Sequence, residues 1–185
     1  MSVPIAKRLL TVSDYHKMAE SGILDEDERV ELIHGEIIEM SPIGSKHAGH
    51  VKRINALLSR LLGNQLIISI QDPVVIGEHS EPEPDIAILR YRDDFYTDRH
   101  PRPEDVLLII EVADSSVDYD REIKIPLFAS AQIPECWIIN LEENKIEVYK
   151  KPQNGTYQEH EDVPKSGTII WETFQLQIKA NRILG

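Results

Sequence analysis

Apolar residues recur along this chain at helical spacing in some stretches and at strand spacing in others. Between residues 47 and 62 they recur every three or four positions, which predicts an amphipathic helix. Thr11 followed by Asp14 resembles a capping box, so a short helix is expected over residues 11–21, before Gly22. A third helical stretch is indicated further along the chain.

That third helix is predicted to begin at Ser115 or Ser116 and to run to about Ala131. Pro126 falls inside it and should either kink the helix or open a second piece.

Strands are expected where apolar residues alternate with polar ones or form short uninterrupted runs. Residues 29–40 alternate on both sides of His34-Gly35, which predicts a hairpin. The other predicted strands cover residues 66–70, 74–76, 85–90, 106–113, 135–140 and 145–150, with short C-terminal strands within 165–180. The polar stretch 91–105 is expected to form a surface loop.

The central order is therefore helix, strand, strand, strand, helix, strand. It predicts an α/β fold with a mixed central sheet flanked by helices, preceded by the N-terminal helix and hairpin. At 185 residues the chain suits one domain over 1–185, with a core of about 30–150.

The net charge of −12 argues against a general nucleic-acid coat protein, because phosphate binding requires excess Lys and Arg. Residues 41–63 nevertheless contain no Asp or Glu, while four cations occur there: Lys46, Lys52, Arg53 and Arg60. A solvated helix face and a phosphate-binding surface both fit this stretch.

No apolar run approaches the roughly 18 residues needed to cross a bilayer, and no signal-peptide pattern opens the sequence. We therefore expect a cytoplasmic protein with no membrane partner. The single cysteine, Cys136, adjoins Trp137 and two isoleucines, which favours a buried reduced thiol over a nucleophile.

Two acidic residues at the ends of predicted strands are the strongest candidates for chemistry. Asp85 opens one strand, and Glu111 closes the apolar run 106–110 of another. Carboxylates are costly to bury without a counter-charge, and Mg²⁺ prefers hard oxygen ligands. Lys124, on the following helix, could orient a water molecule or stabilise negative charge.

Each of these residues also has a structural interpretation. Asp85 could end a turn, Glu111 could face solvent, and Lys124 could pair with Asp120 on a helix surface. Glu111 is the hardest to explain in this way, because the run around it is apolar on both faces.

The order of the motifs resembles the PD-(D/E)XK nuclease superfamily, and within it the Uma-type family of restriction-endonuclease-like proteins. The matching pieces are Glu31 to Glu36, Ser41-Pro42, His47, Glu81 to Asp85, Leu108 to Val112, Asp120, Lys124 and Ile133 to Ile139. This resemblance covers about residues 11–150.

The resemblance implies a restriction-endonuclease-like core of order α-β-β-β-α-β, with metal ligands at Asp85 and Glu111. The usual lysine of the superfamily lies two residues after the second acid, where this chain has Ala113. Lys124 on the next helix is then the implied substitute, and Glu36 is expected near the same site as a weaker member.

The sequence thus predicts an endonuclease that uses Mg²⁺ or Mn²⁺ and acts on DNA. A homodimer would double the basic surface and is one possible assembly. The alternatives are a non-catalytic nuclease-fold binding or adaptor module, which the negative charge favours, and a hydrolase of small phosphoesters.

His47 and His50 are three residues apart, but one histidine near the cleft or in a capping role is preferred to a zinc pair. Glu83 is expected to be exposed.

Overall fold

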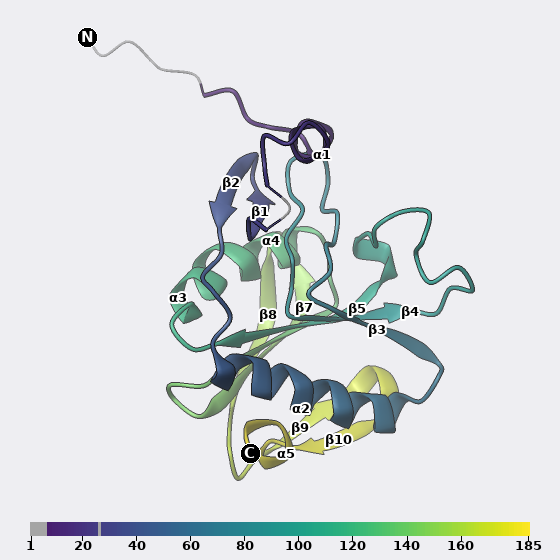
Figure 1. Cartoon of the computed structure of the whole chain (residues 1–185). Coiled ribbons are helices and arrows are strands. Elements are labelled where there is room, and N and C mark those ends of the chain that lie inside the picture. Colours follow the sequence, from purple (N-terminus) through teal and green to yellow (C-terminus); the bar gives the residue numbers. More distant parts are fainter. Residues whose placement is uncertain (1–6, 26) are drawn as a thin grey trace.

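A six-stranded sheet forms the centre of the computed structural model, which describes residues 7–25 and 27–185 (Figure 1). Its spatial order is β3 (Leu66–Ile70), β4 (Ile86–Arg90), β5 (Val106–Ala113), β6 (Glu135–Asn140), β7 (Lys145–Gln153) and β8 (Thr156–Pro164). Neighbouring strands are antiparallel except for β5 and β6, which are parallel. The sheet is therefore mixed, as predicted.

Helices cover both faces of this sheet (Figure 1). One face packs against α2, α5 and the β9–β10 hairpin, and the other packs against α4 and the turns that precede it. The bounds are α2 (Ser45–Leu62), α3 (Val117–Tyr119), the π-helical turn η2 (Asp120–Lys124), α4 (Ile125–Ser130), β9 (Thr168–Trp171), β10 (Leu176–Lys179) and α5 (Asn181–Leu184), with short 3₁₀ turns η1 (Pro103–Asp105) and η3 (Glu172–Phe174). The predicted α-β-β-β-α-β order is confirmed from α2 to β6, and Pro126 lies in the first turn of α4.

Alternation along β4 and β5 decides which face each side chain meets. Ile86 and Ile110 pack on the α2 side, whereas Ala87 and Ile109 pack on the α4 side. Because successive side chains point to opposite faces, Glu111 shares the face of Ile109. The strand pattern therefore directs this acid toward the segment that carries Lys124.

The predicted strand at 74–76 is wrong, although its apolar side chains are buried. The backbone N–H groups of Val74 and Val75 donate to Pro82 and Pro101, and both acceptors lie in loops. Only an isolated bridge joins Ile76 to Ser80. These residues fill the core from a loop, which an apolar run alone does not distinguish from a strand.

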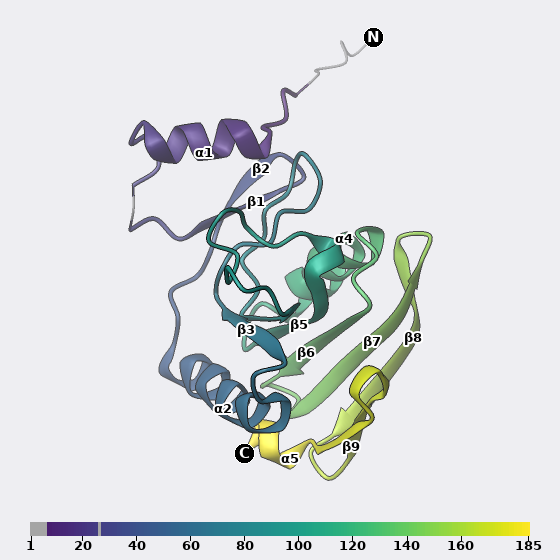
Figure 2. The ribbon, with the colours of Figure 1, turned by 90° about the vertical axis from the view of Figure 1, so that its right-hand side faces the viewer.

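The N-terminal elements are α1 (Val12–Glu20) and the hairpin of β1 (Val30–Ile33) and β2 (Glu36–Glu39). Thr11 and Asp14 form the predicted capping box of α1. His34 and Gly35 make the hairpin turn with φ of 51° and 79°, the left-handed region that a tight turn requires. Figure 2 shows α1 beyond the hairpin, at the opposite end of the molecule from α2.

Two smaller expectations are also met in the part of the chain that is described. Cys136 is fully buried, as its apolar neighbours indicated. None of the helices in residues 7–25 and 27–185 is both long and apolar enough to span a membrane.

Candidate functional site

Asp85 and Glu111 lie opposite each other across the β4–β5 pair. Ile86 pairs with Ile110 in antiparallel register, so the preceding Asp85 faces Glu111. The Asp85 backbone N–H donates to Oε2 of Glu111 over 3.3 Å, and the Val112 N–H donates to Oδ2 of Asp85 over 2.8 Å. The structure thus brings the two predicted acids together.

Lys124 joins this pair from the other side of the pocket. Its Nζ lies 3.2 Å from Oε1 of Glu111 and 3.2 Å from Oε2 of Glu31, and the side chain is only 7% exposed. The lysine ends the π-helical turn η2, a rare geometry that often marks functional sites. A surface pairing with Asp120 is therefore not the reason for this residue.

Glu31, rather than Glu36, is the hairpin carboxylate at this site. Glu36 adjoins the hairpin turn, is 53% exposed and pairs with Lys7 over 2.9 Å, so the expectation that it lies near the acid pair is wrong. Glu31 lies deeper in β1 and also accepts from the Tyr119 hydroxyl. The Glu31 side chain is buried, at 1% exposure. The sequence signal that could have identified it is an acid inside an apolar run, with Val30 before it and Leu32 and Ile33 after it.

His47 reaches the acid pair from the first turn of α2. Its Nε2 lies 2.9 Å from Oδ2 of Asp85, while Gln71 donates to the other oxygen over 3.3 Å. His50 turns away, with Nδ1 2.8 Å from the Lys46 carbonyl. The two histidines therefore do not form a zinc pair. One histidine, His47, lies at the cleft, which was one of the two expected alternatives.

These side chains line a pocket of about 470 Å³, within the size range of ligand sites. Its wall holds seven carboxylates together with Lys124: Glu31, Glu39, Glu83, Asp85, Glu111, Asp114 and Asp120. Glu83, expected to be exposed, is instead half-buried, and burial raises its pKa. Neither Glu83 nor Asp120 was identified from the sequence as a member of the site.

Burial and the excess of acids shift the pKa values of the ionisable groups in the pocket. Burial raises the pKa of Glu111 well above its usual range, despite the opposing effect of Lys124. Burial likewise raises the pKa of Asp120 to about 6. Burial alone would lower the pKa of Lys124, but the carboxylates of Glu111, Glu31 and Asp120 outweigh it and raise that pKa. The lysine therefore stays charged, while the acids still lack sufficient counter-charge.

This donor set fits a hard divalent cation. Asp85 and Glu111 offer carboxylate oxygens from neighbouring strands, and Mg²⁺ or Mn²⁺ binds such oxygens while keeping water in its other positions. A cation would also offset the negative charge that Lys124 leaves uncompensated.

The basic stretch lies along α2. Lys52, Arg53 and Arg60 are exposed, and Lys46 pairs with Asp114 over 2.8 Å. The first turn of α2 contains no acid, and Gly44 before it lines the pocket. The partial positive charge of a helix N-terminus therefore lies beside the carboxylates.

A family model named Uma2, with the description "Putative restriction endonuclease", matches residues 12–181. A solved structure described as "a putative nuclease belonging to DUF820", from Anabaena variabilis ATCC 29413, is similar with a TM-score of 0.72 and 16% identity. The similarity covers 95% of this chain and 97% of that chain, and at this identity it shows a shared fold. No curated protein matches the chain.

Proposed function

The chain belongs to the Uma2 family of "Putative restriction endonuclease" proteins, and from this premise we propose that it is a metal-dependent endonuclease acting on DNA. The observation that carries the proposal is the opposed pair of Asp85 and Glu111 with the buried Lys124 beside it. A protein that kept the nuclease fold without catalysis would have no need to hold two carboxylates and an ammonium group together.

Asp85 and Glu111 would hold Mg²⁺ or Mn²⁺ through their carboxylate oxygens. Bound there, such a cation polarises a phosphoryl oxygen and lowers the pKa of a bound water. The Val112 N–H and His47 fix the Asp85 carboxylate, which reduces the rearrangement needed to ligate.

Lys124 supplies a permanent positive charge to the same pocket. The Nζ atom of Lys124 forms an ion pair with Glu31 and another with Glu111, each at 3.2 Å. The ammonium group is therefore held in place. Negative charge grows on the phosphoryl oxygens as a phosphodiester is attacked, and a fixed, buried cation stabilises that charge. Glu31 is accordingly a positioning residue for Lys124 in this proposal.

DNA would approach along α2. The N-terminal end of this helix lies at the pocket, and Lys52, Arg53 and Arg60 continue the positive charge along its exposed residues. Three or four cations are few compared with the roughly 6–10 phosphate contacts of a tight binder. A homodimer would double the number, and sedimentation of the protein with and without DNA measures this directly.

The substrate class is decided by parallel assays on supercoiled plasmid, linear duplex, single-stranded DNA and a small phosphodiester such as bis(p-nitrophenyl) phosphate. Each reaction is run with Mg²⁺, with Mn²⁺ and with EDTA. We expect plasmid and duplex to be cut with either metal and to be intact with EDTA. The variant Glu111→Gln should lose the activity, which shows that it belongs to this protein.

Two outcomes oppose the proposal. Turnover of the small phosphodiester without cutting of DNA would indicate a small-phosphoester hydrolase. Retarded DNA migration without cleavage under any metal would indicate a nuclease-fold binding module.

A further inference from the structure

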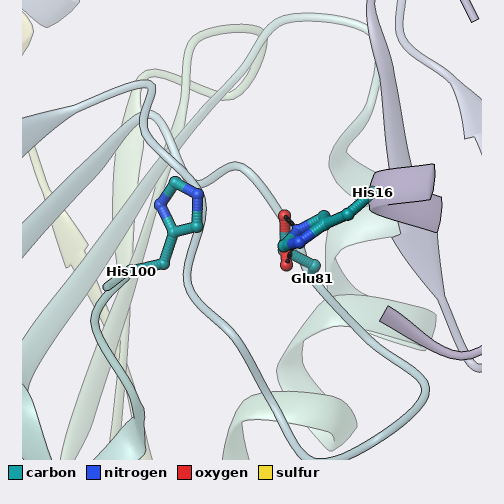
Figure 3. A group of neighbouring side chains, drawn as sticks. All are labelled: His16, Glu81 and His100. Atoms are coloured by element: carbon teal, nitrogen blue, oxygen red, sulfur yellow. Dashed lines mark hydrogen bonds and ion pairs between the residues drawn. The ribbon is translucent and has the colours of Figure 1, made fainter. Parts of the chain in front are cut away.

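A second cluster of metal-ligating side chains lies outside the acidic pocket, where α1 meets two loops (Figure 3). It consists of His16 from α1, Glu81 from the loop before β4 and His100 from the loop before η1. One ligand atom from each residue lies within 4.8 Å of the other two. In Figure 3 His16 and Glu81 are in contact, and the His100 ring lies across from them.

Glu81 is a buried carboxylate without a permanent counter-charge. Its side chain is 3% exposed, and within residues 7–25 and 27–185 it makes no ion pair with lysine or arginine. Both of its oxygens approach the same atom, Nε2 of His16, at 2.9 and 2.8 Å. A single N–H must then serve two acceptors, which leaves a buried anion poorly satisfied.

The backbone holds the three segments in place around this cluster. The Val12 N–H donates to the Glu78 carbonyl over 2.8 Å, which fixes α1 against the loop of Glu81. Glu81 itself exchanges backbone hydrogen bonds with Leu32, and the Val75 N–H donates to Pro101, next to His100. The ligand-bearing positions are therefore organised before any ion binds.

We propose that His16, Glu81 and His100 form a binding site for a borderline divalent metal, foremost Zn²⁺, with water in the fourth position. Two imidazoles and one carboxylate suit zinc, whereas the carboxylate pair of Asp85 and Glu111 suits magnesium. Ligand atoms on one tetrahedral zinc ion lie about 3.3 Å apart, and those of the cluster lie within 4.8 Å of one another, so the widest separation closes by at most about 1.5 Å. His100 is exposed and can supply that movement by side-chain rotation.

The ion would tie α1 to the rest of the molecule. No residue of α1 is buried, so packing holds this helix only weakly. Glu81 is also four residues before Asp85, and the segment between them contains Pro82 and Pro84. A metal at Glu81 would therefore stabilise the stretch that leads into the acidic pocket.

The other mixed cluster in the described chain lacks these properties. Glu147, His160 and Asp162 also lie close together, but Arg121 and Lys145 already pair with its acids. Its charge is compensated without an ion.

The test is a zinc titration of the purified, metal-free protein, using a chromophoric chelator as competitor and an excess of Mg²⁺ to fill the acidic pocket. We expect one Zn²⁺ per chain at this site. His100→Gln should weaken binding at least about tenfold, and Glu81→Gln should weaken it further. Free zinc at about 100 times the Kd should raise the Tm of the parent protein by about 5–10 °C.

Two variants serve as controls. His34→Asn removes an exposed histidine outside the cluster, and Asp85→Asn removes an acid of the other pocket. Both should retain zinc binding. Because His100 makes no side-chain hydrogen bond within the described residues, His100→Gln should fold normally, which a circular dichroism spectrum checks. Absence of binding at micromolar zinc would overturn the proposal, as would equal affinity in the parent, His16→Gln and His100→Gln.

Discussion

Replacing Lys124 by methionine tests how the acidic pocket is balanced. Methionine keeps the unbranched shape of the lysine stem and removes the terminal ammonium group with its charge, so the change leaves the packing of η2 largely intact. Glu31 and Glu111 both lose the cation that lies 3.2 Å from each. Breaking a buried ion pair from one side usually costs about 3–5 kcal/mol, since the remaining charge is uncompensated.

The pH sets a limit on that cost, because a stranded carboxyl group can bind a proton. Removing one cation requires one further proton in the pocket. For a glutamate with an ordinary pKa of 4.5, that proton costs about 5 kcal/mol at about pH 8 and about 1.4 kcal/mol at about pH 5.5. The carboxyl group that has lost its cation has a raised pKa in the folded state. Its cost to the free energy of unfolding is therefore absent below about pH 4.5 and grows as the pH rises.

We therefore expect Lys124→Met to lower the free energy of unfolding by about 3–5 kcal/mol near pH 8 and by about 1 kcal/mol near pH 5.5. Urea unfolding in EDTA, followed by circular dichroism, measures both values. Lys52→Met, which removes an exposed lysine of α2, is the matched control and should change stability by less than about 0.5 kcal/mol. A loss for Lys124→Met that is equal at both pH values would refute the charge argument.

Three further predictions concern other parts of the molecule. Glu31→Gln should slow plasmid nicking at least about tenfold, whereas Glu36→Gln should leave the rate within about twofold, because only the first lies at Lys124. Burial would raise the pKa of Glu147, but hydrogen bonds, the strongest from Arg121, lower it to about 2. The pair of Arg121 and Glu147 therefore stabilises the fold fully above about pH 4.5, and this stabilisation is lost as the pH falls toward 2. Arg121→Gln should accordingly cost about 2 kcal/mol near pH 7, with a smaller difference from the parent at low pH, as acid titration by circular dichroism measures. Gly35→Ala should cost about 1–3 kcal/mol in urea unfolding, because the φ of 79° disfavours any Cβ.

The order of the central elements could be predicted because their apolar periodicity reflects burial on a sheet or against it. The run around Glu111 is buried on both faces, as its composition indicated. Asp85 and Lys124 could be connected to it once the order of strands was known, since a strand pair and the next helix meet at one edge. Their separation in sequence carries no such information by itself.

The hairpin shows where the sequence was insufficient. Glu31 and Glu36 both lie in short alternating strands, and alternation does not say which position faces a pocket. In the observed register Glu31 pairs with Ile38, which lines the pocket, and Glu36 pairs with Ile33 beside the turn, so both acids lie on one face of the hairpin. The turn fixes this register, but which end of that face meets the pocket depends on how the hairpin packs against the rest of the chain.

The contact partners of distant residues could not be predicted, although one histidine near the cleft was an expected alternative. His47 lies 38 residues before Asp85, and its contact depends on where α2 begins relative to β4. The cluster of His16, Glu81 and His100 joins a helix and two loops, and no spacing in the sequence marks it. Irregular segments lack the periodicity from which contacts can be inferred.

The most direct test of the proposed nuclease is the rate of nicking of supercoiled plasmid in Mg²⁺ by the parent protein, Asp85→Asn and Asp93→Asn, purified in parallel. Asp93 is an exposed residue of the loop 91–105 and serves as the matched control. The account predicts that Asp93→Asn keeps the parent rate, that EDTA abolishes it, and that Asp85→Asn is at least about 100-fold slower. Nicking by Asp85→Asn at the parent rate would contradict it.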